Sequence, residues 1–199
     1  MPILGALVGF FASSGAIAAL PAQAAAPAIA PAPVAPIAAL PINPPAYAVT
    51  MTAYNAVPAQ TDSNPTITAS GAFANPQVVA ARSQDLGKEL PFGTIIRIEG
   101  PSGKPGADCG YGVVGNDIGY RVIADTMNRK FTNRIDILFG TKDNYLLGDG
   151  HVLNAANIMG VCPGMRIQVV GFVNISDPAH LPTSQAALAA LAERQTASN

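Results

Sequence analysis

Six short runs that are mostly apolar, five of them with two or more Val or Ile residues, follow residue 46, and the segments between them are rich in Gly, Pro and Asn. The runs have the length and composition of β-strands, and the segments between them have the chemistry of turns. Six strands with long loops suit a small closed barrel, because closure leaves no strand edge unpaired. The sequence therefore predicts a mainly β fold, a six-stranded barrel with long loops, whose strands lie at about 47–54, 76–81, 94–98, 120–125, 134–139 and 166–173.

Two of the expected strands carry an aspartate, Asp125 and Asp136, and these carboxylates are eleven residues apart. Because side chains alternate between the faces of a strand, Ile135 and Ile137 share one face, and Asp136 shares the other with Leu138. A carboxylate among Ile and Leu is costly unless it is paired or protonated. A carboxyl that retains its proton suits general acid catalysis. The competing interpretation is that each Asp caps a turn and satisfies loop amides.

Four short motifs extend the pattern, and they follow one another in the order Thr52-Ala53-Tyr54, Pro91-Phe92-Gly93-Thr94, Asp125-Thr126 and Ile135-Asp136-Ile137. In this order and spacing they resemble the 3D domain, a bacterial cell-wall family named for three aspartates. The family includes the catalytic domain of membrane-bound lytic transglycosylase A and small secreted muralytic enzymes, and the resemblance covers roughly residues 47–173. It implies a double-psi β-barrel and non-hydrolytic cleavage of peptidoglycan glycan strands at the MurNAc-GlcNAc bond, with a 1,6-anhydro product.

The resemblance also implies roles for individual residues. Asp136 matches the catalytic acid/base of the transglycosylases, and Asp125 matches the aspartate of the Asp-Thr/Val-Gly-Gly stretch. Asp85 is the candidate for the first aspartate. Asp85, Thr52 and Tyr54 are expected to orient the catalytic carboxyl or to hydrogen-bond the sugar, although Thr52 and Tyr54 could equally serve to pack the barrel wall.

Two departures from the family pattern keep other functions open. Met127-Asn128 stand where the family has Gly-Gly, and Asp85 lies one residue further from Pro91 than in the commonest pattern. One alternative function is a non-catalytic barrel that binds or loosens the cell wall. Another is a structural barrel that docks a protein partner at the cell surface.

The two ends of the chain have a different composition from residues 47–176, which we assign to the barrel domain. Residues 1–24 combine an apolar stretch with an Ala-x-Ala site, which predicts a signal peptide, or a membrane anchor if it stays uncleaved. An Ala/Pro-rich linker is expected at 25–46. We therefore expect export to the periplasm or the cell wall, with membrane contact only through the leader. Residues 150–160 are expected to form a short helix across one barrel end. The stretch from Ser184 to Gln195 is helix-prone and Ala-rich, but Pro178 and Pro182 separate it from the barrel, so 177–199 is expected to be a frayed tail.

Composition excludes several classes of function. The net charge is −1 and no Lys/Arg run is present, so we expect no nucleic-acid partner. His151 and His180 make no metal-ligand spacing with the cysteines, so neither a metal nor a cofactor is expected. Cys109 and Cys162 are the two cysteines of the chain, and in an oxidising compartment they could form a disulfide or remain as thiols.

Overall fold

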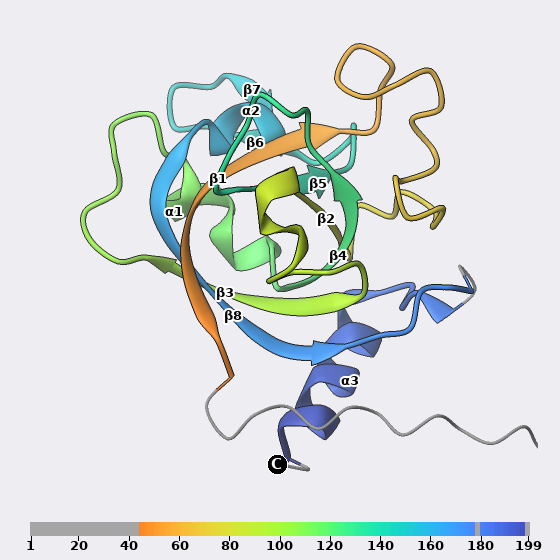
Figure 1. The fold of residues 1–199 in the computed structure, drawn as a ribbon. Coiled ribbons are helices and arrows are strands. Elements are labelled where there is room, and N and C mark those ends of the chain that lie inside the picture. The colour runs from red at the N-terminus through yellow and green to blue at the C-terminus, as the bar shows by residue number, and fades with distance from the viewer. Residues whose placement is uncertain (1–43, 178–179, 198–199) are drawn as a thin grey trace, which may run out of the picture. The chain divides into compact units, whose positions relative to one another are not determined.

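The computed structural model describes residues 44–177 and 180–197. Its centre is a closed barrel of six strands in the order β1-β5-β2-β4-β3-β8, so the expected mainly β fold class is confirmed (Figure 1). The barrel strands are β1 (Ala46–Asn55), β2 (Val79–Arg82), β3 (Thr94–Pro101), β4 (Tyr120–Thr126), β5 (Arg134–Phe139) and β8 (Cys162–Phe172).

The barrel mixes parallel and antiparallel pairing. β1 with β5 and β2 with β4 are parallel pairs, whereas the other neighbouring strands of the barrel run antiparallel. Parallel strands cannot be joined by a tight hairpin, so the chain must cross over between them. This mixed order, with two parallel pairs, is compatible with the double-psi connectivity that the family resemblance implies.

Apolar side chains form two clusters, one on each side of the barrel wall. The first cluster takes residues from all six strands and fills the barrel interior, where Met51, Ile135 and Ile137 are fully buried. The second lies on the outer side and includes Leu138 with residues of a loop and of the C-terminal helix. Strand β5 therefore alternates as the sequence predicts, and Asp136 projects to the outer side.

Short helices and one hairpin cover the mouths of the barrel. The 3-10 helix η1 (Gln84–Gly87) contributes Leu86 to the interior cluster. The expected helix within 150–160 is shorter than predicted, because it is preceded by a strand that the sequence did not indicate. The elements at these mouths are α1 (Tyr111–Val114), η2 (Gly115–Asp117), the hairpin of β6 (Asn144–Leu146) with β7 (Val152–Asn154), and α2 (Ala155–Met159).

The expectation of a frayed C-terminal tail is wrong. Residues of that segment form the helix α3 (Gln185–Ala197), which packs against β8 and β4 (Figure 1). Leu188 and Ala192, four residues apart, are buried on one helical face. The Gln195 side chain binds both the N–H and the carbonyl of Phe172, at 2.7 and 2.8 Å. The sequence did not indicate this contact, because the buried face of α3 is made of Leu188 and Ala192 within an otherwise Ala-rich helix.

The remaining sequence predictions concern the N-terminus and the cysteines. The expected leader at 1–24 and the linker up to residue 43 lie outside the described residues. Among the residues described, every helix is too short or too polar to cross a membrane. Cys109 and Cys162 are joined by a disulfide with a Cα–Cα distance of 4.6 Å. The disulfide connects the segment before α1 to the start of β8.

Candidate functional site

Four strands place one residue each in a row across the outer face of the barrel. The register pairs Thr52 of β1 with Asp136 of β5, Asp136 with Ala81 of β2, and Ala81 with Asp125 of β4. The small Ala81 side chain therefore separates the two carboxylates. Aspartates eleven residues apart in sequence lie two strand spacings apart, about 10 Å between their Cα atoms.

A β-bulge turns Asp125 towards this row. The pairing of β2 with β4 shifts between Ala80 and Ala81, so that Ile123 pairs with Ala80 but Asp125 pairs with Ala81. Without the shift, Asp125 would follow Ile123 to the interior side. The extra residue, Ala124, uses its carbonyl to accept a hydrogen bond from Ser70 N–H at 3.1 Å. Bulges commonly redirect a side chain next to a functional site.

Asp136 has the environment of a carboxyl that can hold a proton near neutral pH. Burial raises the pKa of Asp136 to about 6, while the hydrogen bond from Thr52 and the charge of Arg134 oppose the rise and Asp125 adds to it. The Thr52 hydroxyl donates to Asp136 Oδ1 at 2.7 Å. No donor contacts Oδ2 from the part of the chain that the structure describes, so this oxygen is available to a ligand.

Asp125, in contrast, is held by three donors. Its Oδ1 accepts hydrogen bonds from Ala69 N–H at 2.9 Å and Thr126 N–H at 2.8 Å, and its Oδ2 accepts one from the Tyr54 hydroxyl at 3.0 Å. Burial first, and then the neighbouring charge of Asp125, raise the pKa of Tyr54 well above its ordinary value, so Tyr54 remains a donor. Both oxygens of Asp125 are engaged, which suits a positioning role.

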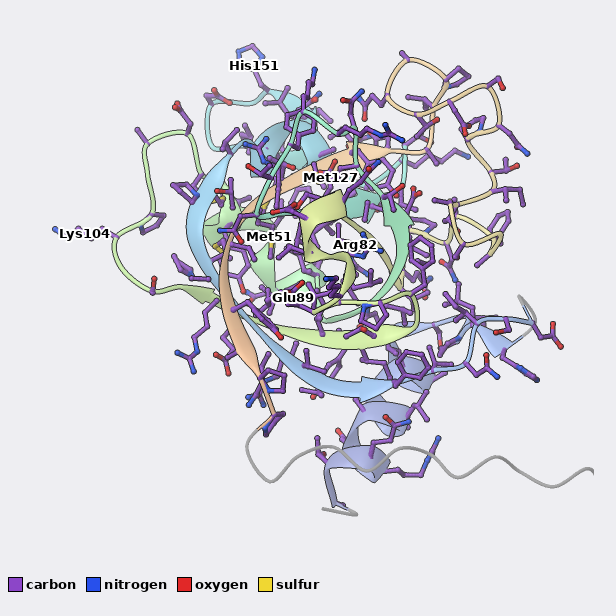
Figure 2. The ribbon with its side chains drawn as sticks, in the orientation of Figure 1. Met51, Arg82, Glu89, Lys104, Met127 and His151 are labelled. Atoms are coloured by element: carbon purple, nitrogen blue, oxygen red, sulfur yellow. A yellow bond between two sulfur atoms is a disulfide. The ribbon has the colours of Figure 1, made fainter. Side chains whose placement is uncertain are left out.

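These residues line a pocket of about 420 Å³. Asp125, Asp136, Tyr54 and Ala81 form part of its wall, and the long loop after β1 forms another part through Gln60, Thr61, Asp62, Pro65, Ile67, Thr68 and Ala69. Sequence reasoning missed this loop, because its role depends on the Ala69 and Ser70 hydrogen bonds to β4. Met127 and Phe131 line a further part, and Figure 2 labels Met127.

Thr52 and Tyr54 reach the aspartates, but Asp85 does not join them. Asp85 lies on η1 and is not among the residues that line the pocket. Its Oδ2 accepts a hydrogen bond from Asn133 N–H at 2.8 Å, and a bond with Ser83 is the largest cause that lowers the pKa of Asp85. Asn133 has a φ of 48°, so Asp85 stabilises the turn before β5. Asp85 thus lies apart from the two carboxylates, and its expected part in substrate binding stays a prediction.

The site offers proton transfer and hydrogen bonding. Within residues 44–177 and 180–197, no group of three or more His, Cys, Asp or Glu could hold a metal ion. One carboxyl can exchange a proton, and a second is fixed beside it by a tyrosine and two backbone amides. Such a pocket can protonate a leaving oxygen without a metal ion or a covalent nucleophile. No protein-family model matches this chain, and no curated protein sequence matches it.

Proposed function

We propose that this chain is a peptidoglycan lytic transglycosylase that acts outside the cytoplasmic membrane, with Asp136 as its single general acid/base. The observation that carries the proposal is the environment of Asp136. Burial raises the pKa of this carboxyl to about 6, and the carboxyl lies in the wall of a pocket. Its Oδ2 accepts no hydrogen bond from the residues that the structure describes. The motif order shared with the 3D domain family and the apolar leader support the substrate and the location.

The reaction begins with proton donation. Protonated Asp136 donates its proton to the glycosidic oxygen, and the bond from that oxygen to the anomeric carbon of MurNAc breaks. The C6 hydroxyl of the same sugar attacks the anomeric carbon and forms the 1,6-anhydro ring. Its proton passes to the Asp136 carboxylate, which restores the acid. Because the nucleophile is intramolecular, the step gains from proximity and needs no activated water.

The geometry favours this reaction over hydrolysis by two carboxylates. A hydrolase needs either a second carboxylate that activates water or one that acts as nucleophile. Both oxygens of Asp125 are occupied by donors, so Asp125 is poorly placed for either task. We assign it the tasks of holding the loop at Ala69 and of raising the pKa of Asp136 through its charge. Thr52 fixes the orientation of the Asp136 carboxyl.

Digestion of purified sacculi tests the proposal. Wild-type protein should release muropeptides that carry a 1,6-anhydro ring, identified by mass spectrometry as lighter by one water than reducing-end products. Asp136→Asn should lower the rate by at least the roughly 10²–10⁴-fold that general acid catalysis supplies. The matched control is Asp149→Asn, since Asp149 lies at the exposed turn between β6 and β7. Reducing-end products, or full activity in Asp136→Asn, would refute the mechanism.

A wall-binding barrel is the second candidate, and one observation favours it. Met127 stands where the resembling enzymes have glycine, and its side chain is buried in the pocket wall. Sedimentation with intact sacculi, without release of any muropeptide by the wild type, would support binding alone. Met127→Gly should then be tested for a gain of cleavage.

A further inference from the structure

Arg121, near the start of β4, is an unusual residue to find in the core of this barrel. Its side chain is 1% exposed, and it forms no ion pair with any described residue. The carbonyl of Gln77 accepts a hydrogen bond from Nη1, while Nε is buried without a partner among the residues described. Burial lowers the pKa of Arg121 to about 10, with the Asp143 charge opposing the shift. An uncompensated buried charge is strongly destabilising.

The guanidinium lies beside a second pocket, which has about 410 Å³ and shares no lining residue with the Asp136 pocket. Arg121 and Phe139 form part of its inner wall, and the exposed Lys142 and Asn144 lie at its rim. These two rim side chains supply N–H donors that a ligand can reach. The pocket therefore combines a buried cation with an accessible cation and an amide.

The acidic residues of this pocket are already engaged. Tyr145 donates its hydroxyl to Asp117, and Gly140 N–H donates to Asp143 Oδ2 at 2.6 Å. Neither carboxylate forms an ion pair with Arg121 or Lys142. Asp143 therefore offsets part of the guanidinium charge from a distance, but no carboxylate of these neighbours forms an ion pair with Arg121.

We propose that this second pocket binds a carboxylate group, with Lys142 and Asn144 as direct donors and Arg121 as the buried counter-charge. The carboxylate is assigned to the peptide stem of peptidoglycan, and this choice of source rests on the proposed function. Arg121 and Asp125 are four residues apart on β4, about 13 Å along the strand. The bulge turns Asp125 to the outer face, whereas Arg121 is buried on the inner side. A stem peptide of glycan bound near Asp136 must therefore pass round the end of the barrel to bring its carboxylate to the second pocket.

Binding measurements on the folded chain test this site. The probes are stem tetrapeptide released from peptidoglycan by an amidase, the same peptide with its carboxylates esterified, and sodium acetate. Calorimetry should show binding of the free peptide and none of the ester. Lys142→Gln should weaken binding by up to about fivefold, the size of an exposed charge contact. Lys104→Gln is the matched control, because Lys104 points away from the barrel (Figure 2).

Arg121→Met supplies a second readout. It should weaken peptide binding by at least about tenfold, as loss of a charged partner does. It should also raise the melting temperature of the ligand-free protein, because an unpaired buried charge is removed. Gln77 O keeps the hydrogen bond from Gln185 Nε2 in this variant.

The outcomes separate the two proposals. If acetate and the stem peptide bind the wild type with equal affinity, and both lose binding in Arg121→Met, the carboxylate site is supported but its assignment to wall peptides is overturned. Equal binding of free and esterified peptide, or unchanged binding in both Arg121→Met and Lys142→Gln, overturns the site. If the wild type cleaves sacculi but binds no carboxylate, this inference fails while the proposed function stands.

Discussion

The hydrogen bond between Thr52 and Asp136 gives a quantitative test of the site. The Thr52 hydroxyl stabilises the charged carboxylate at 2.7 Å and thereby lowers the pKa of Asp136 from the value that burial alone would set. Thr52→Val removes the donor and keeps a side chain of similar shape. The pKa of Asp136 should therefore rise.

The size of this rise follows from the strength of the bond. A hydrogen bond to a charged group contributes about 1.5–3 kcal/mol. Because water can reach the partly exposed carboxyl, we take the lower end of that range. About 1.5 kcal/mol corresponds to a pKa rise from about 6 to about 7. At pH 7 the protonated fraction of Asp136 should then increase about fivefold, because a carboxyl with a pKa near 6 is mostly ionised at that pH and one with a pKa near 7 is about half protonated.

Two assays report this change. Carboxyl NMR should follow the Asp136 titration directly, whatever the function of the protein. The pH dependence of anhydro-muropeptide release should show a falling alkaline limb that moves up by about one pH unit in Thr52→Val. Thr50→Val is the control, because Thr50 shares the same face of β1 but pairs with Arg134. An Asp136 titration that stays in place or moves to lower pH in Thr52→Val would refute the account of this site.

Three further predictions concern stability. Because burial raises the pKa of Asp136 to about 6, its ionisation destabilises the fold as pH rises from about 4 through 6. Asp136→Asn should thus gain about 1–2 kcal/mol in urea unfolding at pH 7, and nothing at pH 3.5; equal gains at both values would contradict this. Reduction of Cys109–Cys162, which closes a separation of 53 residues, should lower the free energy of unfolding by up to ~4 kcal/mol, measured by denaturation with and without reductant. Leu188→Ala should destabilise the protein by about 2–4 kcal/mol and expose α3 to proteolysis, because Leu188 is fully buried; a variant as stable as wild type would mean that α3 contributes little to the fold.

Local patterns in the sequence were sufficient to predict the barrel strands and one half of the site. The runs of Val and Ile gave strands close to their observed positions, because side chains on a pleated strand must alternate between two environments. The same alternation placed Asp136 on the face opposite Ile135 and Ile137. Its raised pKa follows from that placement, since burial is the largest cause.

Contacts between distant residues decided the rest of the site. The bulge at Ala124 directs Asp125 to the outer face, and it depends on the register between β2 and β4 rather than on any local run. The loop that walls the pocket is held by Ala69 N–H, 56 residues from Asp125 in sequence. Asp85 is of a residue type that suits a catalytic site, yet its carboxylate accepts a hydrogen bond from Asn133 N–H in the turn before β5.

In the C-terminal segment too, local sequence predicts the secondary structure, whereas long-range contacts decide the packing. An Ala-rich stretch predicts a helix, but the apolar surface of Leu188 and Ala192 gains burial only because β8 and β4 lie beside it. Arg121 shows the reverse case, in which a charged residue typical of an exposed strand position is enclosed by the barrel. Sequence patterns thus determined which segments are strands and which faces are apolar, because these depend on neighbouring residues. Tertiary structure decided which polar groups meet, because strand register and long-range hydrogen bonds join residues that no local pattern connects.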